Sequence, residues 1–175
     1  MRRVLLFVVL AMLIAALAGC SAYDKAKDLN IEARTEPQDF TLDNVNAGFD
    51  KKVVSSEDWE DNADKIKEVR NVEISYTYTN PTDAVVDVDV YISRQNLDQA
   101  NLDQAILLHQ AVFNPGTDDV SRDDATIENR AAVLNLLKDS NGKFYIYTVT
   151  DAQDAVDIQI TNFRVYGELN ADILE

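Results

Sequence analysis

Few side chains in this sequence could act as nucleophiles or general bases. The chain of 175 residues has one cysteine, Cys20, and one histidine, His109. A Ser-His-Asp or Cys-His system would have to use His109, and no Gly-x-Ser-x-Gly elbow accompanies it. A zinc site needs several histidine or cysteine ligands. We therefore predict that the protein is not an enzyme and holds no cofactor, and that His109 is a structural residue of a strand.

Acidic side chains are plentiful: 31 Asp and Glu against 16 Lys and Arg give a net charge of −15. This charge argues against nucleic acid as a partner. Four carboxylates, Asp118, Asp119, Asp123 and Asp124, are close in sequence and could offer oxygen ligands to Ca²⁺. Carboxylates spread over a whole chain usually serve solubility, so we predict no metal site and a solvated acidic loop. A calcium-dependent adhesin and a carboxylate-based glycan hydrolase remain the alternative functions.

Two tyrosines near the C-terminus form the remaining chemical feature. Tyr145 and Tyr147 alternate with Phe144 and Ile146 along a predicted strand, so they share one face of it. If they face outward, they form a platform for a sugar ring or a partner protein. If they face inward or lie under a helix, they belong to the core.

The first nineteen residues differ in composition from the rest of the chain. Met1-Arg2-Arg3 precedes fifteen consecutive apolar residues, Val4 to Ala18. A membrane-spanning helix needs about 20 apolar residues, so this shorter run suits the apolar region of an export signal. We expect residues 1–19 to be a signal peptide, residues 20–28 a polar tether, and residues 29–175 a single domain.

The residues that close the apolar run, Leu17-Ala18-Gly19-Cys20, resemble the lipobox of bacterial lipoproteins. The resemblance implies that a diacylglyceryl group alkylates Cys20, that the signal is cut between Gly19 and Cys20, and that the new amine is acylated. Three acyl chains, at about 0.8 kcal/mol per buried methylene, would hold the protein on a membrane. Ser21, where an aspartate often retains lipoproteins at the inner membrane, favours the outer membrane of a Gram-negative cell. An ordinary secretory signal or an uncleaved anchor helix is the alternative.

The body of the chain alternates apolar and polar residues with the period of β-strands. Residues 72–79 and 86–92 flank the turn Asn80-Pro81-Thr82-Asp83, which predicts a hairpin. This strand, Asn-Pro, strand arrangement resembles the repeating hairpin of LEA/WHy-type β-sandwich domains. A second pair of strands, 143–150 and 156–160, flanks another turn, and a change of apolar parity predicts a bulge near Thr161-Asn162. Shorter strands are expected at 29–33, 40–45 and 104–113.

Two helices are expected between the strands. The first begins at the capping residues Ser55-Ser56 and ends near Lys67, and the second covers about residues 125–138. Asn96-Leu97-Asp98-Gln99-Ala100 is repeated at once as residues 101–105. A period of five matches neither a helix nor a strand, so we predict an expanded surface loop, with a short helix as the alternative.

These elements predict a mainly β domain, an antiparallel β-sandwich of the immunoglobulin-like or Greek-key type with two short covering helices. The resulting hypothesis is a lipid-anchored protein of the cell envelope that presents a non-enzymatic β-sandwich. Its partners would be membrane lipid through Cys20 and another envelope protein or a polysaccharide.

Overall fold

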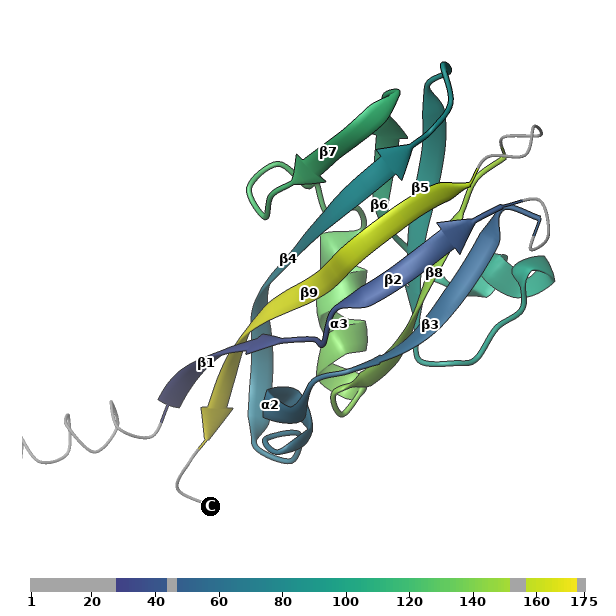
Figure 1. The fold of residues 1–175 in the computed structure, drawn as a ribbon. Helices are drawn as coiled ribbons and strands as arrows, with labels where there is room; N and C mark the ends of the chain where they lie inside the picture. Colours follow the sequence, from purple (N-terminus) through teal and green to yellow (C-terminus); the bar gives the residue numbers. More distant parts are fainter. Residues whose placement is uncertain (1–27, 44–46, 152–156, 173–175) are drawn as a thin grey trace, which may run out of the picture.

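The computed structural model describes residues 28–43, 47–151 and 157–172, which form two antiparallel β-sheets packed face to face (Figure 1). Sheet A contains β1 (Asp28–Arg34), β2 (Gln38–Leu42), β4 (Ile66–Asn80), β7 (Gly116–Val120) and β9 (Ile158–Asp172). Sheet B contains β3 (Phe49–Ser55), β5 (Val86–Ser93), β6 (Ile106–Phe113) and β8 (Lys143–Val149). The predicted β-sandwich is confirmed.

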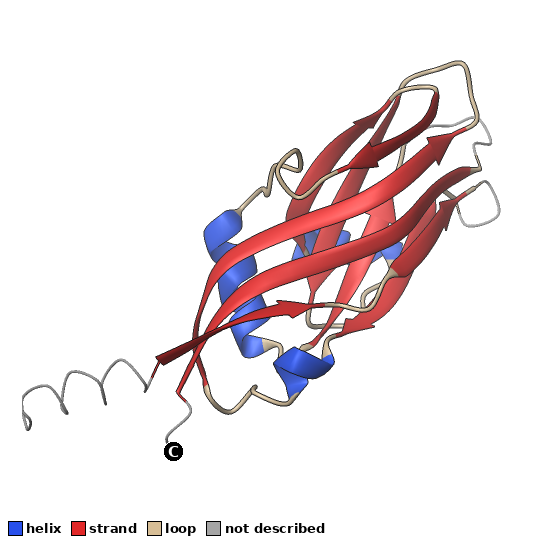
Figure 2. Cartoon of the chain, turned by 60° about the vertical axis from the view of Figure 1, so that its left-hand side comes forward, coloured by secondary structure: helices blue, strands red, loops and turns tan. Residues whose placement is uncertain are grey.

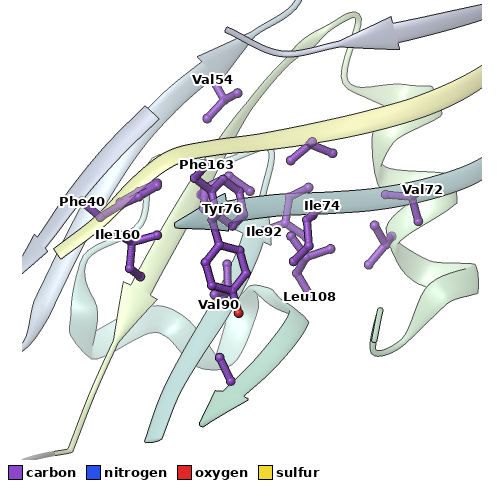
Figure 3. Close-up of a cluster of buried hydrophobic side chains, with 14 of the residues drawn as sticks. Phe40, Val54, Val72, Ile74, Tyr76, Val90, Ile92, Leu108, Ile160 and Phe163 are labelled. Carbon is purple, nitrogen blue, oxygen red and sulfur yellow. The ribbon is translucent and has the colours of Figure 1, made fainter. Parts of the chain in front are cut away.

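The core lies between the sheets and is built from the alternating apolar residues of both. Ile74 and Tyr76 of β4 face Val90 and Ile92 of β5, and all four side chains are buried (Figure 3). The intervening residues of β4 and β5 are polar and face outward, so one apolar side chain in two is enough to fill a two-layer fold.

The predicted hairpin at residues 80–83 is wrong. The strands on either side of this turn form, but β4 belongs to sheet A and β5 to sheet B. β8 and β9, the second predicted pair, are also divided between the sheets. β7 then returns to pair with β4, an arrangement found in Greek keys. Alternation predicts a strand and its buried face, whereas the partner of a strand depends on distant segments.

The predicted bulge in β9 is confirmed. Asn162 has a positive φ of 56°, and the register of β9 shifts at this point against both β2 and β4. Ile160 and Phe163 are therefore both buried although their numbers differ in parity. The extra residue keeps the apolar side chains on one face along all of this 15-residue strand.

The first predicted helix is much shorter than expected. Ser56 is its N-cap residue, as predicted, but α2 covers only Glu57–Glu60, and Lys67 lies in β4. Pairing of Ile66 and the following residues with β9 extends the sheet through the segment expected to be helical. Trp59 is fully buried and packs edge-on against Phe144, so this single turn closes one end of the sandwich.

The second predicted helix is confirmed with a later start. α3 covers Arg130–Asp139 rather than residues 125–138, and the left-handed Gly142 (φ 78°) follows its end. Val133 and Leu137 are its buried residues. Sheet A is longer than sheet B, and α3 covers the part of β4 that sheet B leaves open (Figure 2).

Two strands and a short helix were not predicted as such. β3 contains the consecutive lysines Lys51 and Lys52, and β7 is acidic, so neither has a strand pattern in sequence. The repeated segment, predicted as a loop, contains a 3-10 helix, η1 (Gln99–Gln104). The alternative of a short helix leading into the next strand therefore applies.

The two ends of the described domain lie together at one pole. Asp28 at the start of β1 pairs with Asp172 at the end of β9, and these two strand ends lie side by side in Figure 1. Asn80 and Gly116 pair at the opposite pole. At about 3.3 Å per residue, the fifteen residues of β4 place the poles at most about 50 Å apart.

Candidate functional site

Tyr145 and Tyr147, considered either as a ligand platform or as core residues, lie on the outer face of sheet B. Tyr147 is nevertheless fully buried, because residues 94–105, here called the strap, cross over it between β5 and β6. Its hydroxyl donates to the carbonyl oxygen of Gln95 (2.6 Å) and accepts from the backbone N–H of Leu97 (2.9 Å). Tyr145 is only half-buried. An open platform of two rings is therefore not formed, since the strap covers one of them.

A lysine on the neighbouring strand provides a second attachment for the strap. Lys51 Nζ donates to the carbonyl oxygen of Leu97 (3.1 Å) and pairs with Asp98 Oδ1 (3.3 Å). The Leu97 side chain is only 7% exposed. Phe49 stacks on the ring of Tyr147, with 6.0 Å between the ring centroids. The first half of the strap is therefore held by one apolar side chain and two polar attachments.

The second half of the strap forms one wall of a cavity of about 480 Å³. The floor and walls come from β5, η1, the start of β6 and α3, with six of the lining residues being Tyr91, Leu102, Asp103, Ile106, Asn129 and Ala132. This volume is within the range of small-ligand pockets, about 300–1,000 Å³. In Figure 1 the strap and its short helix lie on the outer side of sheet B, beside β8 and β5.

Tyr91 connects the cavity to the buried tyrosine. It pairs directly with Tyr147 across β5 and β8, so both side chains project from the outer face of sheet B. The Tyr91 hydroxyl donates to Asp89 Oδ2 at 3.2 Å, and partial burial together with this carboxylate raises the pKa of the phenol. Sequence reasoning did not single out Tyr91, because only the register between β5 and β8 reveals its position.

The four carboxylates considered as alternative calcium ligands do not converge on one point. Asp118 and Asp119 lie on the exposed strand β7, where Asp119 Oδ1 accepts from Thr77 Oγ1 at 2.6 Å. Asp124 Oδ2 instead accepts from Ser121 Oγ at 2.6 Å in the following loop, and Asp123 is exposed there. Within residues 28–43, 47–151 and 157–172, no three Asp, Glu, His or Cys side chains are grouped so that they could hold a metal ion.

His109 lies between the two sheets and is only 5% exposed. Its Nδ1 is 2.7 Å from the carbonyl oxygen of Thr126, which can only accept, so Nδ1 carries the proton. Nε2 then accepts from the Tyr76 hydroxyl at 2.9 Å. Burial lowers the pKa of His109, partly opposed by the Thr126 hydrogen bond and by Glu128. Both ring nitrogens are occupied, which agrees with a structural role; the contact with Tyr76 was not foreseen.

An arginine that the sequence analysis did not select organises the outer face of sheet A. Arg122 Nε donates to Glu73 Oε2 (2.5 Å), and its Nη1 donates to Glu32 Oε1 (2.7 Å). The guanidinium lies 4.2 Å from the centre of the Tyr166 ring. These contacts fix the segment that precedes α3 to sheet A. One arginine therefore pairs with a carboxylate from each of two strands of sheet A.

The predicted lipid-attachment residue Cys20 and the cleavage position Gly19–Cys20 lie outside the described residues. Among the helices that the structure does describe, none has the length and apolar character needed to cross a membrane.

Comparisons with known proteins give no family assignment. No protein-family model matches the chain, and no curated protein matches it. A crystal structure of dimeric latent PorU from Porphyromonas gingivalis is similar over 82% of this chain, with 7% identity and a TM-score of 0.42. The chain spans 13% of the length of that PorU chain. The structure of Desmodium yellow mottle tymovirus is similar over 85% of this chain and 90% of the other, with 9% identity and a TM-score of 0.26. Neither likeness is close enough to support an inference about activity or partners.

Proposed function

We propose that this protein is a lipid-anchored component of the bacterial cell envelope that presents a non-enzymatic β-sandwich for binding. The observation that carries the proposal is the sequence Leu17-Ala18-Gly19-Cys20 at the end of fifteen apolar residues. Cys20 is the only cysteine, so it has no disulfide partner, and lipid attachment gives it a defined role.

The geometry of the domain supports attachment from one end. The first described residue, Asp28, is eight residues after Cys20, a separation that spans at most about 28 Å when extended. Asp28 lies at the pole that also contains Asp172, so the turns at Asn80 and Gly116 are directed away from the attachment point. A domain held in this way presents its sides and its far pole to partners in the envelope.

The arrangement of reactive side chains supports a binding role over catalysis. The single histidine is buried with both nitrogens hydrogen bonded, so it cannot activate a nucleophile as it stands. Glu32 and Glu73 share one arginine. The cavity beside the strap, by contrast, combines an aromatic ring with polar groups and is open to solvent.

The anchor is tested by Cys20→Ala in a bacterial host grown with an alkyne-labelled fatty acid, with Ser21→Ala as the matched control. We expect the natural protein and Ser21→Ala to carry label, to lose residues 1–19 and to sediment with membranes. Cys20→Ala should carry no label and retain the mass of the precursor, because cleavage follows lipidation in this class. A free thiol on the mature natural protein, or label on Cys20→Ala, would contradict the proposal.

A further inference from the structure

The geometry points to a saccharide-binding site in the cavity between the strap and α3, with the ring of Tyr91 as the stacking surface. The inference rests on the proposed function, because it names the chemical class that the anchored domain would bind. The cavity, of about 480 Å³, has the aromatic ring of Tyr91 on one side and the aliphatic side chains of Leu102 and Ile106 beside it. Pyranose rings have apolar faces formed by C–H groups, and such faces stack on aromatic rings.

The charge of the cavity favours a neutral ligand rich in hydroxyl groups. Asp103 is the one ionised side chain among its lining residues, and it has no hydrogen-bonding or ionic partner among the described residues. A carboxylate accepts hydrogen bonds from sugar hydroxyls, whereas it repels phosphate or carboxylate ligands. Asn129 also lines the cavity; its Nδ2 donates to the carbonyl oxygen of Leu107 at 3.2 Å, which leaves its Oδ1 as an acceptor for the ligand. An aromatic ring together with these two acceptors suits a neutral hexose unit.

The wall that carries Leu102 and Asp103 is held in position from outside the cavity. Tyr147 and Lys51 fix the preceding residues 95–98 to sheet B, and the backbone N–H of Asn101 donates to the carbonyl oxygen of Asp98 at 2.9 Å. A wall fixed before binding reduces the entropy that a ligand must offset. Tyr147 and Lys51 are therefore positioning residues for this site, and they do not contact the ligand.

The test is calorimetric titration of the purified full-length protein with a panel of neutral hexose oligosaccharides of four to six units. The protein is kept in a sugar-free zwitterionic detergent, because maltoside or glucoside headgroups would compete for the cavity. We expect binding to at least one member of the panel and a loss of about tenfold or more in affinity for Tyr91→Leu. Tyr166→Leu, a matched tyrosine change on the outer face of sheet A, should bind like the natural protein.

A second variant tests the same site in case Tyr91→Leu does not fold. Ala132 lies on the exposed side of α3 and lines the cavity, so Ala132→Phe should fill the site without disturbing the core and should also abolish binding. No heat with any oligosaccharide, or unchanged binding by Ala132→Phe, would overturn the inference. Because these titrations use purified protein, their failure would leave the result of the Cys20→Ala labelling experiment unaffected.

Discussion

The two copies of Asn-Leu-Asp-Gln-Ala have the same sequence and different environments. In the first copy, Leu97 is buried and Asp98 is paired with Lys51. In the second copy, Leu102 is half-buried, Asp103 has no partner among the described residues, and both line the cavity. The first copy attaches the strap to sheet B, and the second copy forms a wall of the proposed saccharide site.

This difference arises from what lies opposite each copy. The first copy crosses Tyr147 and Lys51, which supply a hydroxyl and an ammonium group to it. The second copy begins five residues later, forms most of η1 and faces the opening towards α3. Identical residues thus acquire separate roles because the sheet beneath them differs. A repeat of five residues allows this, since it does not keep one face buried.

The sharpest test of the comparison exchanges the two leucines for alanine in turn. Leu97→Ala should reduce the free energy that holds the strap on sheet B by about 2 kcal/mol, because it removes a buried side chain. We expect the loss to appear as local opening, with amide hydrogen exchange in residues 94–98 about 30-fold faster. Leu102→Ala should lower the free energy of unfolding by less, about 1 kcal/mol, because the side chain of Leu102 is only partly buried. Equal effects of the two changes would mean that the copies are equivalent.

The two walls of the cavity should also differ in their response to pH. The strap is attached through Tyr147, and burial raises the pKa of its hydroxyl, so this contact persists through neutral pH. The wall that contains Asn129 follows Thr126, which is bonded to His109. Burial lowers the pKa of His109 below 6.5, so the unfolded chain binds the proton first as the pH falls. The contribution of neutral His109 to the free energy of unfolding is complete above about pH 7 and decreases below about pH 6.5.

His109→Gln measures this contribution. A glutamine amide can donate to the Thr126 carbonyl and accept from Tyr76, yet it does not titrate. Between pH 7 and 5, urea unfolding of the natural protein should show a slope steeper than that of the variant by at most about 1.4 kcal/mol per pH unit. Exchange of strap amides, corrected for the intrinsic pH dependence, should be the same in both proteins. Identical slopes in the two unfolding series would show that His109 binds its proton equally well in the folded and the unfolded protein.

The hydroxyl of Tyr147 can be tested separately from its ring. Tyr147→Phe removes the hydroxyl that donates to the carbonyl oxygen of Gln95 and accepts from the N–H of Leu97. The strap should then open more easily, by about 1 kcal/mol, because both backbone groups can bond to water once it opens. Tyr145→Phe is the matched control on the same strand, two residues away. Protease sensitivity of the strap should increase for Tyr147→Phe only. An equal increase for both variants would mean that the ring face, rather than the hydroxyl, retains the strap.

The sequence predicted those parts of the fold that depend on local periodicity. The alternation in β4 and β5 identified their buried residues, and the parity change at Asn162 located the bulge in β9. Partners were not predictable, since β4 and β5 alternate in the same way whether they pair or face each other across a core. The helix expected up to Lys67 failed for the same reason, because β9 extends pairing to Ile66.

The candidate site depended even more on distant contacts. Tyr147 was selected from its strand, but nothing near it in sequence shows that residues 95–98 cover it. Tyr91 becomes significant only through its register with Tyr147. Asp103 and Asp98 occupy the same place in the repeated motif, and only Lys51, about fifty residues earlier, distinguishes them.

The two aspartates provide the smallest and most specific test. The Asp98 side chain is 84% exposed and that of Lys51 34%, so their ion pair should contribute less than about 1 kcal/mol. Asp98→Asn should therefore accelerate exchange in the strap slightly at low ionic strength. The difference should disappear near 1 M salt, where the screening length is about 3 Å. Asp103→Asn should leave strap exchange unchanged at any salt concentration and should instead alter oligosaccharide affinity, because its carboxylate faces the cavity. If Asp98→Asn changes the affinity as strongly as Asp103→Asn does, the separation between an attaching copy and a binding copy is incorrect.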